Sequence, residues 1–421
     1  MLETYFVQPQ TVDRVRASWI GSQIERYVVW LAEHGYSTRT VLRRVPLLAA
    51  FGEFARLRGA RSVEDLPAHV EAFVAQRVGD HRGTRRGGPS EVAKEVRGPV
   101  EQMLGLAVQG FEGTRRKRPG DPFVAWAPGF STYLVSERGL RPATILHYQH
   151  HLRRFEAYLG RIGVTHLEEL SPAVVSAFVA ERSAAQLAKT TIRDVCGVLR
   201  IFLRYARREG LLSSDLARTV EWPQAYRLST IPRSISWADV EKVLRGIDRR
   251  TPHGKWDYAI LLLLVTYGLR GREVAALTLD DIDWKRERLI IPERKAGHST
   301  AFPLSASVGN ALVDYLRNGR PQTTDRHGFF RAMAPLQPIG AAAVSSRARH
   351  YLLKAGIEVP RPGSHTLRHT CVQRLVDTGF SLKTVGDFVG HRSPASTAIY
   401  AKVAVESLRQ VALGDGEDVL G

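Results

Sequence analysis

The sequence has little cysteine and no long apolar run. Cys196 and Cys371 are the only cysteines among 421 residues, which excludes a disulfide framework and a zinc site built on cysteines. The longest apolar stretch, residues 258–267, is far shorter than the ~20 residues that a membrane-spanning helix needs. Residues 1–19 lack the basic-then-apolar pattern of a signal peptide. We therefore expect a cytoplasmic protein that does not enter a membrane.

Positive charge, in contrast, is abundant. The chain has 60 Lys and Arg against 42 Asp and Glu, which gives a formal net charge of +18 and a pI near 10.2. Such a chain attracts a polyanion, and this binding should weaken steeply as the salt concentration rises. The hydrophobic content of 44% is that of a globular protein, and the length suggests two or three domains. Charge alone favours a nucleic-acid partner, although a generally basic soluble protein has the same composition.

An internal repeat occupies the first half of the chain. Residues 30–77 and 133–182 align at an offset of 104, with a one-residue insertion before the closing Phe-Val-Ala. The matching pairs are Gly35 and Gly139, Thr40 and Thr144, Phe51 and Phe155, Gly59 and Gly163, and Leu66 and Leu170. We predict two versions of one helical unit, a first repeat at about 15–111 and a second that ends near residue 210.

The last helix of each repeat differs in pattern. In the second repeat, residues 190–208 place apolar side chains at helical spacing and leave Arg193, Arg200, Arg204, Arg207 and Arg208 available for phosphates. A solvated basic face is the ordinary alternative. In the first repeat the corresponding helix, residues 90–108, contains Pro99, which should kink or break it.

The last third of the chain carries side chains suited to phosphodiester chemistry. They are Arg270, Lys295, His365, Arg368, His391 and Tyr400. Two guanidiniums can hold the non-bridging oxygens of a phosphate bidentately and stabilise the charge that grows on them. Histidine and lysine can move protons, and a tyrosine can be a covalent nucleophile. The chain has no P-loop and no metal-ligand cluster, so we expect neither a cofactor nor a metal.

The ordered pattern Arg … Lys … His-x-x-Arg … His … Tyr resembles that of the tyrosine recombinases, the family of phage integrases and of the Xer and Cre enzymes. The resemblance covers roughly residues 125–413. It implies a mainly α protein with one or more helical SAM-like core-binding domains and an α+β catalytic domain that contains a small β-hairpin or sheet. It also implies a DNA strand transferase that forms a 3′-phosphotyrosyl bond at Tyr400, with Lys295 protonating the leaving 5′ oxygen. The implied partners are double-stranded DNA and further copies of the chain, as a tetramer on synapsed DNA, with other recombinases or accessory proteins as additional candidates.

The repeat and the resemblance together divide the chain. We expect an N-terminal helical domain at 1–118, a core-binding domain at 119–222, a linker at 223–236 and a catalytic domain with a C-terminal tail at 237–421. Ser236 should cap the first helix of the catalytic domain. Whether the first repeat contacts DNA or protein stays open.

Local patterns place the site residues. An apolar helix at 259–267 should be buried and end at Gly268, just before Arg270. Lys295 should lie in a turn between two strands within 288–305, with Arg294 and His298 as alternative proton donors. His365 and Arg368 should share one face of a helix. His369 lies on the neighbouring face and should pack or hydrogen-bond locally, and Arg272 should be a bystander.

The biological event is not specified by these patterns. Integration, excision and transposition of a mobile element are all compatible with them. Two other functions remain open: a DNA-relaxing enzyme similar to type IB topoisomerases, and a non-catalytic DNA-binding protein derived from an integrase. The intact Tyr400 argues against the second, and the helical core-binding units argue against the first.

Overall fold

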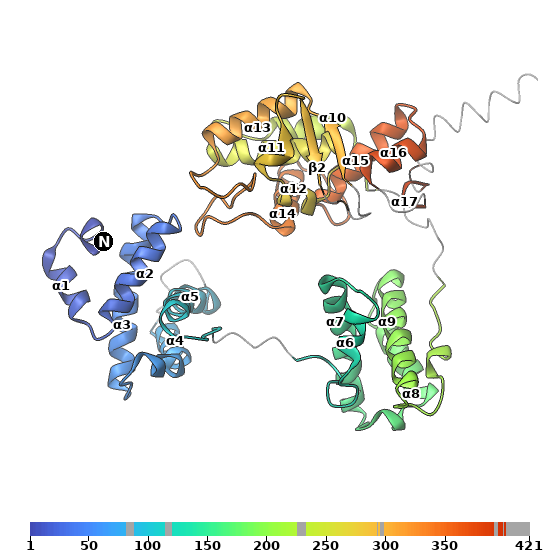
Figure 1. Cartoon of the computed structure of the whole chain (residues 1–421), viewed down its shortest axis with the longest axis horizontal. Helices are drawn as coiled ribbons and strands as arrows, with labels where there is room; N and C mark the ends of the chain where they lie inside the picture. Colours follow the sequence, from blue (N-terminus) through green and yellow to red (C-terminus); the bar gives the residue numbers. More distant parts are fainter. Residues whose placement is uncertain are drawn as a thin grey trace, which may run out of the picture. The chain divides into compact units, whose positions relative to one another are not determined.

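The computed structural model describes residues 1–80, 88–113, 120–224, 233–292, 294, 299–390, 395–398 and 400 (Figure 1). Its contacts group residues 1–114 with 230–421 in one compact unit and place residues 115–229 in a second. Three large hydrophobic cores are separate from one another, within residues 2–111, 123–220 and 235–388. Among the described residues, no helix is long and apolar enough to cross a membrane.

The N-terminal part is entirely helical. Its elements are η1 (Leu2–Thr4), α1 (Pro9–Ala17), α2 (Gly21–Glu33), α3 (Thr38–Leu57), η2 (Val63–His69), α4 (Val70–Gly79) and α5 (Pro89–Ala107). The prediction that Pro99 breaks the last helix is wrong, because α5 continues through it. Pro99 is buried, and its neighbours Val96 and Val100 pack into the same core. This packing offsets the hydrogen bond that proline cannot donate within the helix.

The second unit repeats the same order of elements. They are α6 (Phe130–Ser136), α7 (Pro142–Arg161), η3 (Leu167–Glu169), α8 (Pro172–Ala184), α9 (Lys189–Arg208) and a final η4 (Leu216–Arg218). Helices α3 and α7 begin and end at positions that are 104 residues apart, the offset of the sequence repeat. Phe51 and Phe155 occupy matching positions in the two helices, and both are fully buried.

Helix α9 buries its apolar stripe as predicted, including Ile192, Val195, Leu199 and Phe202. Its arginines are less available than the sequence indicates. Arg200 donates to the carbonyl oxygen of Val220 and stacks on Trp222, Arg207 donates to the carbonyl oxygen of Leu212, and Arg208 pairs with Glu137 and Glu209. Of the five predicted arginines, Arg193 and Arg204 are exposed and have no hydrogen bond or ion pair among the described residues, so they are left for phosphates.

The C-terminal part of the first unit combines helices with a small sheet. Its helices are α10 (Trp237–Arg245), α11 (Pro252–Tyr267), α12 (Gly271–Ala276), η5 (Leu279–Asp281), α13 (Ala306–Asn318), α14 (Ala341–Lys354), α15 (Ser364–Asp377), α16 (Leu382–Val389) and α17 (Ala395–Ala398). Strands β1 (Ile282–Asp283), β2 (Arg288–Ile291) and β3 (Thr300–Pro303) form an antiparallel sheet in the order β1-β2-β3. Leu289 pairs with Phe302 and Ile291 with Thr300. The described chain is therefore mainly helical with one three-stranded sheet.

Helix α11 lies at the centre of this part. Its residues 259–265 are all apolar and buried, as the sequence predicts, and the helix packs against α13, α15, α14 and α12. One buried carboxylate lies on this helix: Asp257 accepts two hydrogen bonds from Arg347 of α14, at 2.6 and 2.7 Å, and one from the hydroxyl of Tyr351. This charge-assisted, bidentate contact fixes α14 against α11. Ser236 caps α10 as predicted, since its Oγ accepts from the backbone N–H of Asp239 at 3.1 Å.

Candidate active site

Arg270 is held at the end of the central helix. Gly268 ends α11 in the left-handed conformation, with φ of +58°, and the chain turns directly into α12. Nη1 of Arg270 donates to Oε1 of Glu273 at 2.7 Å, while its backbone N–H donates to Oε2 of the same carboxylate at 2.8 Å. Nη2 donates to the carbonyl oxygen of Gly390 at 2.8 Å. Both ends of the Arg270 side chain are thereby fixed, and only 16% of it is exposed.

Arg368 lies beside it on α15 and is almost completely buried. Its Nη1 donates to the carbonyl oxygen of Gly268 and its Nη2 to that of Val389, the latter at 2.7 Å. Burial, together with the charge of Arg270, lowers the pKa of Arg368 to about 10. The guanidinium remains charged at neutral pH, although its hydrogen-bond acceptors are neutral carbonyls. Arg270 pairs with Glu273, whereas the acceptors of Arg368 among the described residues carry no charge, so the two guanidiniums together form a place where an anion is stabilised.

His365 is one helical turn before Arg368 on α15, as the spacing predicts. Partial burial lowers the pKa of His365, and the charges of Arg368 and Arg270 lower it further. The imidazole is therefore neutral near pH 7 and can both donate and accept a proton.

Tyr400 is buried in a small apolar cluster with Val372, Val385 and Val389, and only 2% of it is exposed. Its hydroxyl is hydrogen-bonded to Nδ1 of His369, and the two ring centroids are 5.7 Å apart. Burial raises the pKa of the Tyr400 phenol. The sequence predicts that His369 packs or hydrogen-bonds locally. Its ring does contact that of His365 one turn earlier, with centroids 6.3 Å apart, but its hydrogen bond goes to Tyr400, 31 residues further along the chain.

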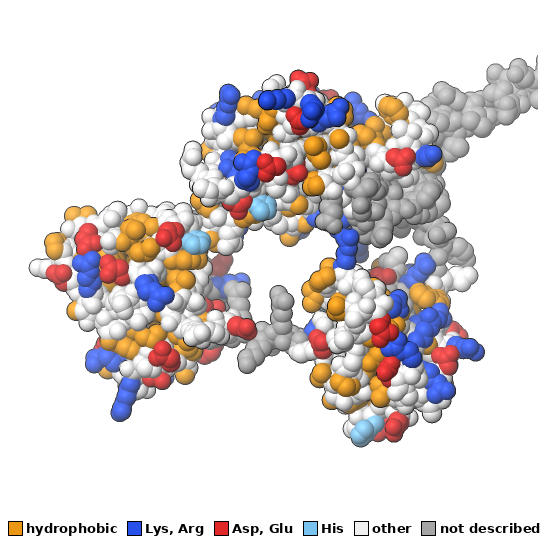
Figure 2. All heavy atoms as spheres, in the orientation of Figure 1, with side chains coloured by type: hydrophobic (Ala, Val, Ile, Leu, Met, Phe, Trp, Pro, Cys, Tyr) orange, Lys and Arg blue, Asp and Glu red, His pale blue; other side chains and the backbone are white. Residues whose placement is uncertain are grey.

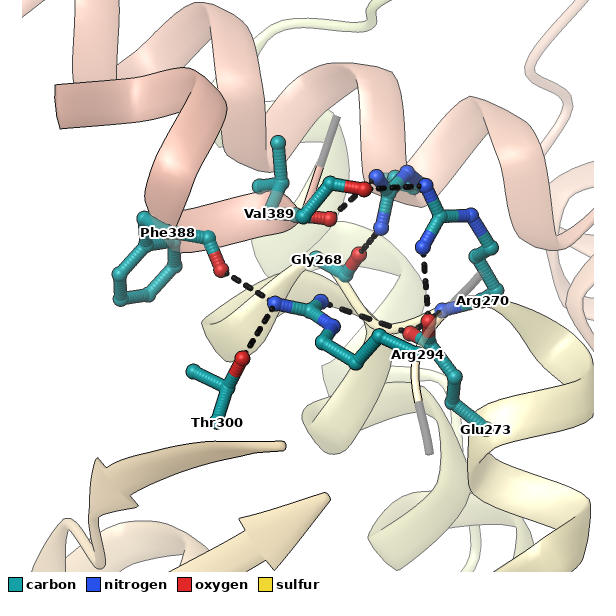
Figure 3. A network of polar contacts seen from close by, with 9 residues as sticks. Gly268, Arg270, Glu273, Arg294, Thr300, Phe388 and Val389 are labelled. Carbon is teal, nitrogen blue, oxygen red and sulfur yellow. Dashed lines mark hydrogen bonds and ion pairs between the residues drawn. The ribbon is translucent and has the colours of Figure 1, made fainter. Parts of the chain in front are cut away.

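The β2–β3 connection contributes Arg294, whose side chain points inward. It is fully buried, and its Nη2 lies 3.5 Å from Oε2 of Glu273. Figure 3 shows Arg270 and Arg294 reaching the same Glu273 from two sides, close to Phe388 and Val389 at the end of α16. A fully buried side chain cannot donate a proton to a substrate from this position. Lys295, His298 and His391 lie outside the described residues.

The structure brings together four of the six predicted residues around the end of α16. Arg270 and Arg368 bind consecutive carbonyl oxygens there, those of Gly390 and Val389. His365 adjoins Arg368, and Tyr400 packs against Val389. Arg272 is exposed, and its role as a bystander stays a prediction. Among the residues that the structure describes, no group of His, Cys, Asp or Glu is placed to hold a metal ion.

Comparison with known proteins agrees with this geometry. Residues 234–407 match the profile described as "Phage integrase family", and residues 128–210 match "Phage integrase, N-terminal SAM-like domain". A Sinorhizobium fredii protein named as an integrase/recombinase (y4rA) is 33% identical over 398 residues, which cover 92% of each chain. The chain belongs to the phage integrase family of tyrosine recombinases. It is thus a member of a family of DNA strand transfer enzymes.

More distant members of the family cover less of the chain. The tyrosine recombinase XerD of Mycobacterium tuberculosis is 30% identical over 301 residues, which are 68% of this chain but 95% of XerD. About a third of the present chain therefore has no counterpart in that alignment.

Solved structures show the same fold at low identity. The XerH recombinase bound to palindromic difH substrate in a post-cleavage complex covers 83% of this chain and 96% of its own, with a TM-score of 0.55 and 16% identity. A lambda integrase dimer bound to a COC' core site covers 66% of this chain and 94% of its own, with a TM-score of 0.53 and 17% identity.

Proposed function

We propose that the protein is a site-specific recombinase that cleaves and rejoins double-stranded DNA through a 3′-phosphotyrosyl intermediate. The observation that carries this proposal is the pair of guanidiniums at the end of α16. Arg270 and Arg368 bind adjacent carbonyl oxygens, and among the described residues Glu273 is hydrogen-bonded to Arg270 but not to Arg368. An oxyanion that enters this site meets two preorganised cations, and such preorganisation stabilises the charge of a phosphoryl transition state.

In the proposed step, a neutral histidine of the site takes the phenolic proton of Tyr400, Oη of Tyr400 attacks the scissile phosphorus, and the bond between phosphorus and the 5′ oxygen breaks. Arg270 and Arg368 hold the non-bridging oxygens, and His365 hydrogen-bonds to the phosphate. Lys295 supplies the proton to the leaving 5′ oxygen, and His391 completes the contacts to the phosphate. The 5′-hydroxyl of a partner strand then attacks the phosphotyrosine and restores Tyr400. The bond energy stays in the phosphotyrosine, so the cycle needs neither nucleotide nor metal.

DNA is the proposed partner, and a tetramer on synapsed DNA is the proposed assembly. The net charge of +18 supports a polyanion, and the XerH and lambda integrase structures with the same fold are complexes with DNA. A mobile element is the proposed context, in keeping with the name of the Sinorhizobium fredii relative. The proposed division of the chain remains an N-terminal domain at 1–118, a core-binding domain at 119–222, and a catalytic domain at 237–421.

We further propose that the N-terminal domain is a duplicated core-binding domain that contacts protein rather than DNA. Support comes from the shared order of elements and from their last helices. Helix α9 carries Lys189, Arg193, Arg200, Arg204, Arg207 and Arg208 against Asp194 alone, whereas α5 carries Lys94 and Arg97 against Glu91, Glu95 and Glu101. In Figure 2, acidic and basic side chains are interspersed over the visible face of the N-terminal domain. A surface of that kind attracts phosphates weakly.

Replacing Tyr400 by phenylalanine tests the proposed reaction. The change removes one oxygen and leaves the apolar packing of the ring, so binding to the target DNA in a gel-shift assay should persist. Covalent adducts on a nicked suicide substrate should disappear, while the wild-type protein should form them in excess EDTA without nucleotide. Adducts formed by the Tyr400→Phe variant would assign the nucleophile to another residue. A strict metal requirement of the wild type for cleavage would overturn the mechanism.

A further inference from the structure

Arg294 is a charged side chain buried in a place where sequence predicts a solvated turn. It follows β2 and precedes Lys295, yet none of its surface is exposed. Burying a guanidinium is costly unless it is paired and hydrogen-bonded. The contacts of Arg294 should therefore have a structural or functional reason.

Its contacts join three segments that are distant in the sequence. Nη1 donates to the carbonyl oxygen of Phe388 at 2.7 Å and to Oγ1 of Thr300 at 3.4 Å. Nη2 pairs with Glu273 at 3.5 Å, and the guanidinium carbon lies 5.4 Å from the centroid of the Phe302 ring. Figure 3 shows these bonds converging on one guanidinium between the strands, α12 and the end of α16.

Glu273 connects this guanidinium to the anion site. Its Oε1 accepts from Arg270 and its Oε2 faces Arg294, so one carboxylate orients two arginines. Burial opposes ionisation of Glu273, but the backbone N–H of Arg270 and the charge of Arg294 outweigh it, and the pKa of this carboxyl is lowered. A change at residue 294 therefore alters the environment of Arg270 through a fixed intermediary.

The same guanidinium also lies flat against the end of α16. A Cβ atom at Gly390 would lie 2.9 Å from Nε of Arg294 and 3.0 Å from Cζ. The carbonyl oxygen of Gly390 is the acceptor for Arg270, and His391 is the next residue in the chain. Arg294 thus adjoins Lys295 through a peptide bond and adjoins the residue that precedes His391 through van der Waals contact.

We propose that Arg294 is a positioning residue that anchors the base of the β2–β3 connection, so that Lys295 reaches the leaving 5′ oxygen. This inference rests on the proposed function, in which Lys295 protonates that oxygen. Strands β2 and β3, which flank the connection, have only four residues each. Such short strands are not enough to hold the first residues of the connection in one position. The bonds of Arg294 to Phe388 and Glu273 supply the missing anchor, and they tie it to the arginine that holds the phosphate.

The test compares two leaving groups. Arg294→Met keeps a long side chain that can stay buried, but it removes the charge and the hydrogen bonds. Single-turnover cleavage of a saturating suicide substrate should fall on the order of 10²-fold, the cost of a misplaced catalytic group. A substrate with sulfur in place of the bridging 5′ oxygen expels a thiolate, which needs no proton donor. With that substrate, most of the deficit should disappear.

Two further variants make the result decisive. Arg286→Met alters an exposed arginine in the turn between β1 and β2 and should cleave both substrates as the wild type does. Arg294→Lys keeps the positive charge and can replace Arg294→Met in the test if the methionine variant does not fold. Its loss of cleavage rate should be smaller, and that loss should likewise disappear with the substrate that carries sulfur. An unimpaired Arg294→Met protein, or a deficit equal on oxygen and sulfur in a folded variant, would overturn the proposal. These comparisons need a wild-type protein that cleaves the substrate. If the wild type does not cleave, the proposed function fails, and this result is distinct from a failure of the proposal for Arg294.

Discussion

The hydroxyl of Tyr400 is hydrogen-bonded to Nδ1 of His369, and this bond holds the proposed nucleophile inside the protein. Burial, with the charges of His365 and Arg368, lowers the pKa of His369 to about 4, so the imidazole is neutral at pH 7. The pKa of Tyr400 is raised by its own burial, so the phenol keeps its proton and donates it to the imidazole. A tyrosine that is 2% exposed cannot reach a phosphate on bound DNA without moving. The described arrangement is therefore a resting one.

Chemical access to Tyr400 should depend on His369. In the free wild-type protein, tetranitromethane should nitrate Tyr400 less than the half-buried Tyr258, as measured by peptide mass spectrometry. His369→Ala removes the acceptor and should raise nitration of Tyr400 several-fold. His365→Ala removes the imidazole one turn earlier on the same helix, which is not the one hydrogen-bonded to Tyr400, and is the matched control. Nitration of Tyr400 at the level of Tyr258 in the free wild type would contradict the resting arrangement.

Loss of either site arginine should slow cleavage strongly. Arg270→Ala and Arg368→Ala each remove a charge-assisted contact to the phosphate, and the single-turnover rate should fall on the order of 10²–10³-fold. Arg272→Ala, two residues after Arg270 and exposed, should have little effect. Thermal unfolding of the same preparations separates a catalytic loss from a folding defect. Equal rates for the Arg270 and Arg272 variants would reverse the choice between them.

Removal of the N-terminal domain should leave cleavage intact. A truncated protein that begins at Asp121 keeps two of the three large hydrophobic cores and should fold. It should still form covalent adducts on a suicide substrate. Its footprint on DNA should keep the same length, while assembly of the multi-protomer complex should be weaker. A footprint that shrinks at one flank would show that the domain binds DNA, and a complete loss of cleavage would contradict the domain division.

The core-binding domain should lose stability in mild acid because of His151. This imidazole is buried, and neither ring nitrogen has a hydrogen-bond partner among the described residues. Burial, together with His147 and His150, lowers the pKa of His151 to about 4. Between pH 6.5 and 4 the unfolded chain binds this proton and the native chain does not, so stability falls as the pH falls. The melting temperature should drop less between pH 7 and pH 5 in His151→Phe than in the wild type, and equal drops would contradict the assignment.

Local features of the fold were predictable from sequence. Gly268 ends the buried helix, Ser236 caps α10, and strands β2 and β3 lie on either side of Lys295 in the sequence, because each of these depends on residues within one or two turns. The rule for Pro99 failed because tertiary packing of α5 outweighed a local preference. The internal repeat was visible in the sequence because its matching residues keep a constant offset of 104. The first and last residues of α3 and α7 differ by the same offset.

The inward direction of Arg294 and the partner of His369 were not predictable. Both depend on contacts between segments that lie far apart in the chain, such as Arg294 with Phe388. An arginine beside a turn lysine is usually solvated, and a histidine beside a site arginine usually packs locally. Glu273 offered one indirect signal, because a carboxylate three residues after Arg270 has two oxygens, and each of them can bind a different arginine.

Gly390 has no side chain, yet its α-carbon is among the most constrained atoms of the site. It ends α16 with φ of +65°, its carbonyl oxygen binds Arg270, and Arg294 occupies the space where a Cβ would project. A library of random substitutions should therefore reject alanine at this position as firmly as it rejects replacement of an arginine. The positions that do not tolerate substitution would then include residues that leave space for the guanidiniums, and not only the residues whose side chains take part in the chemistry.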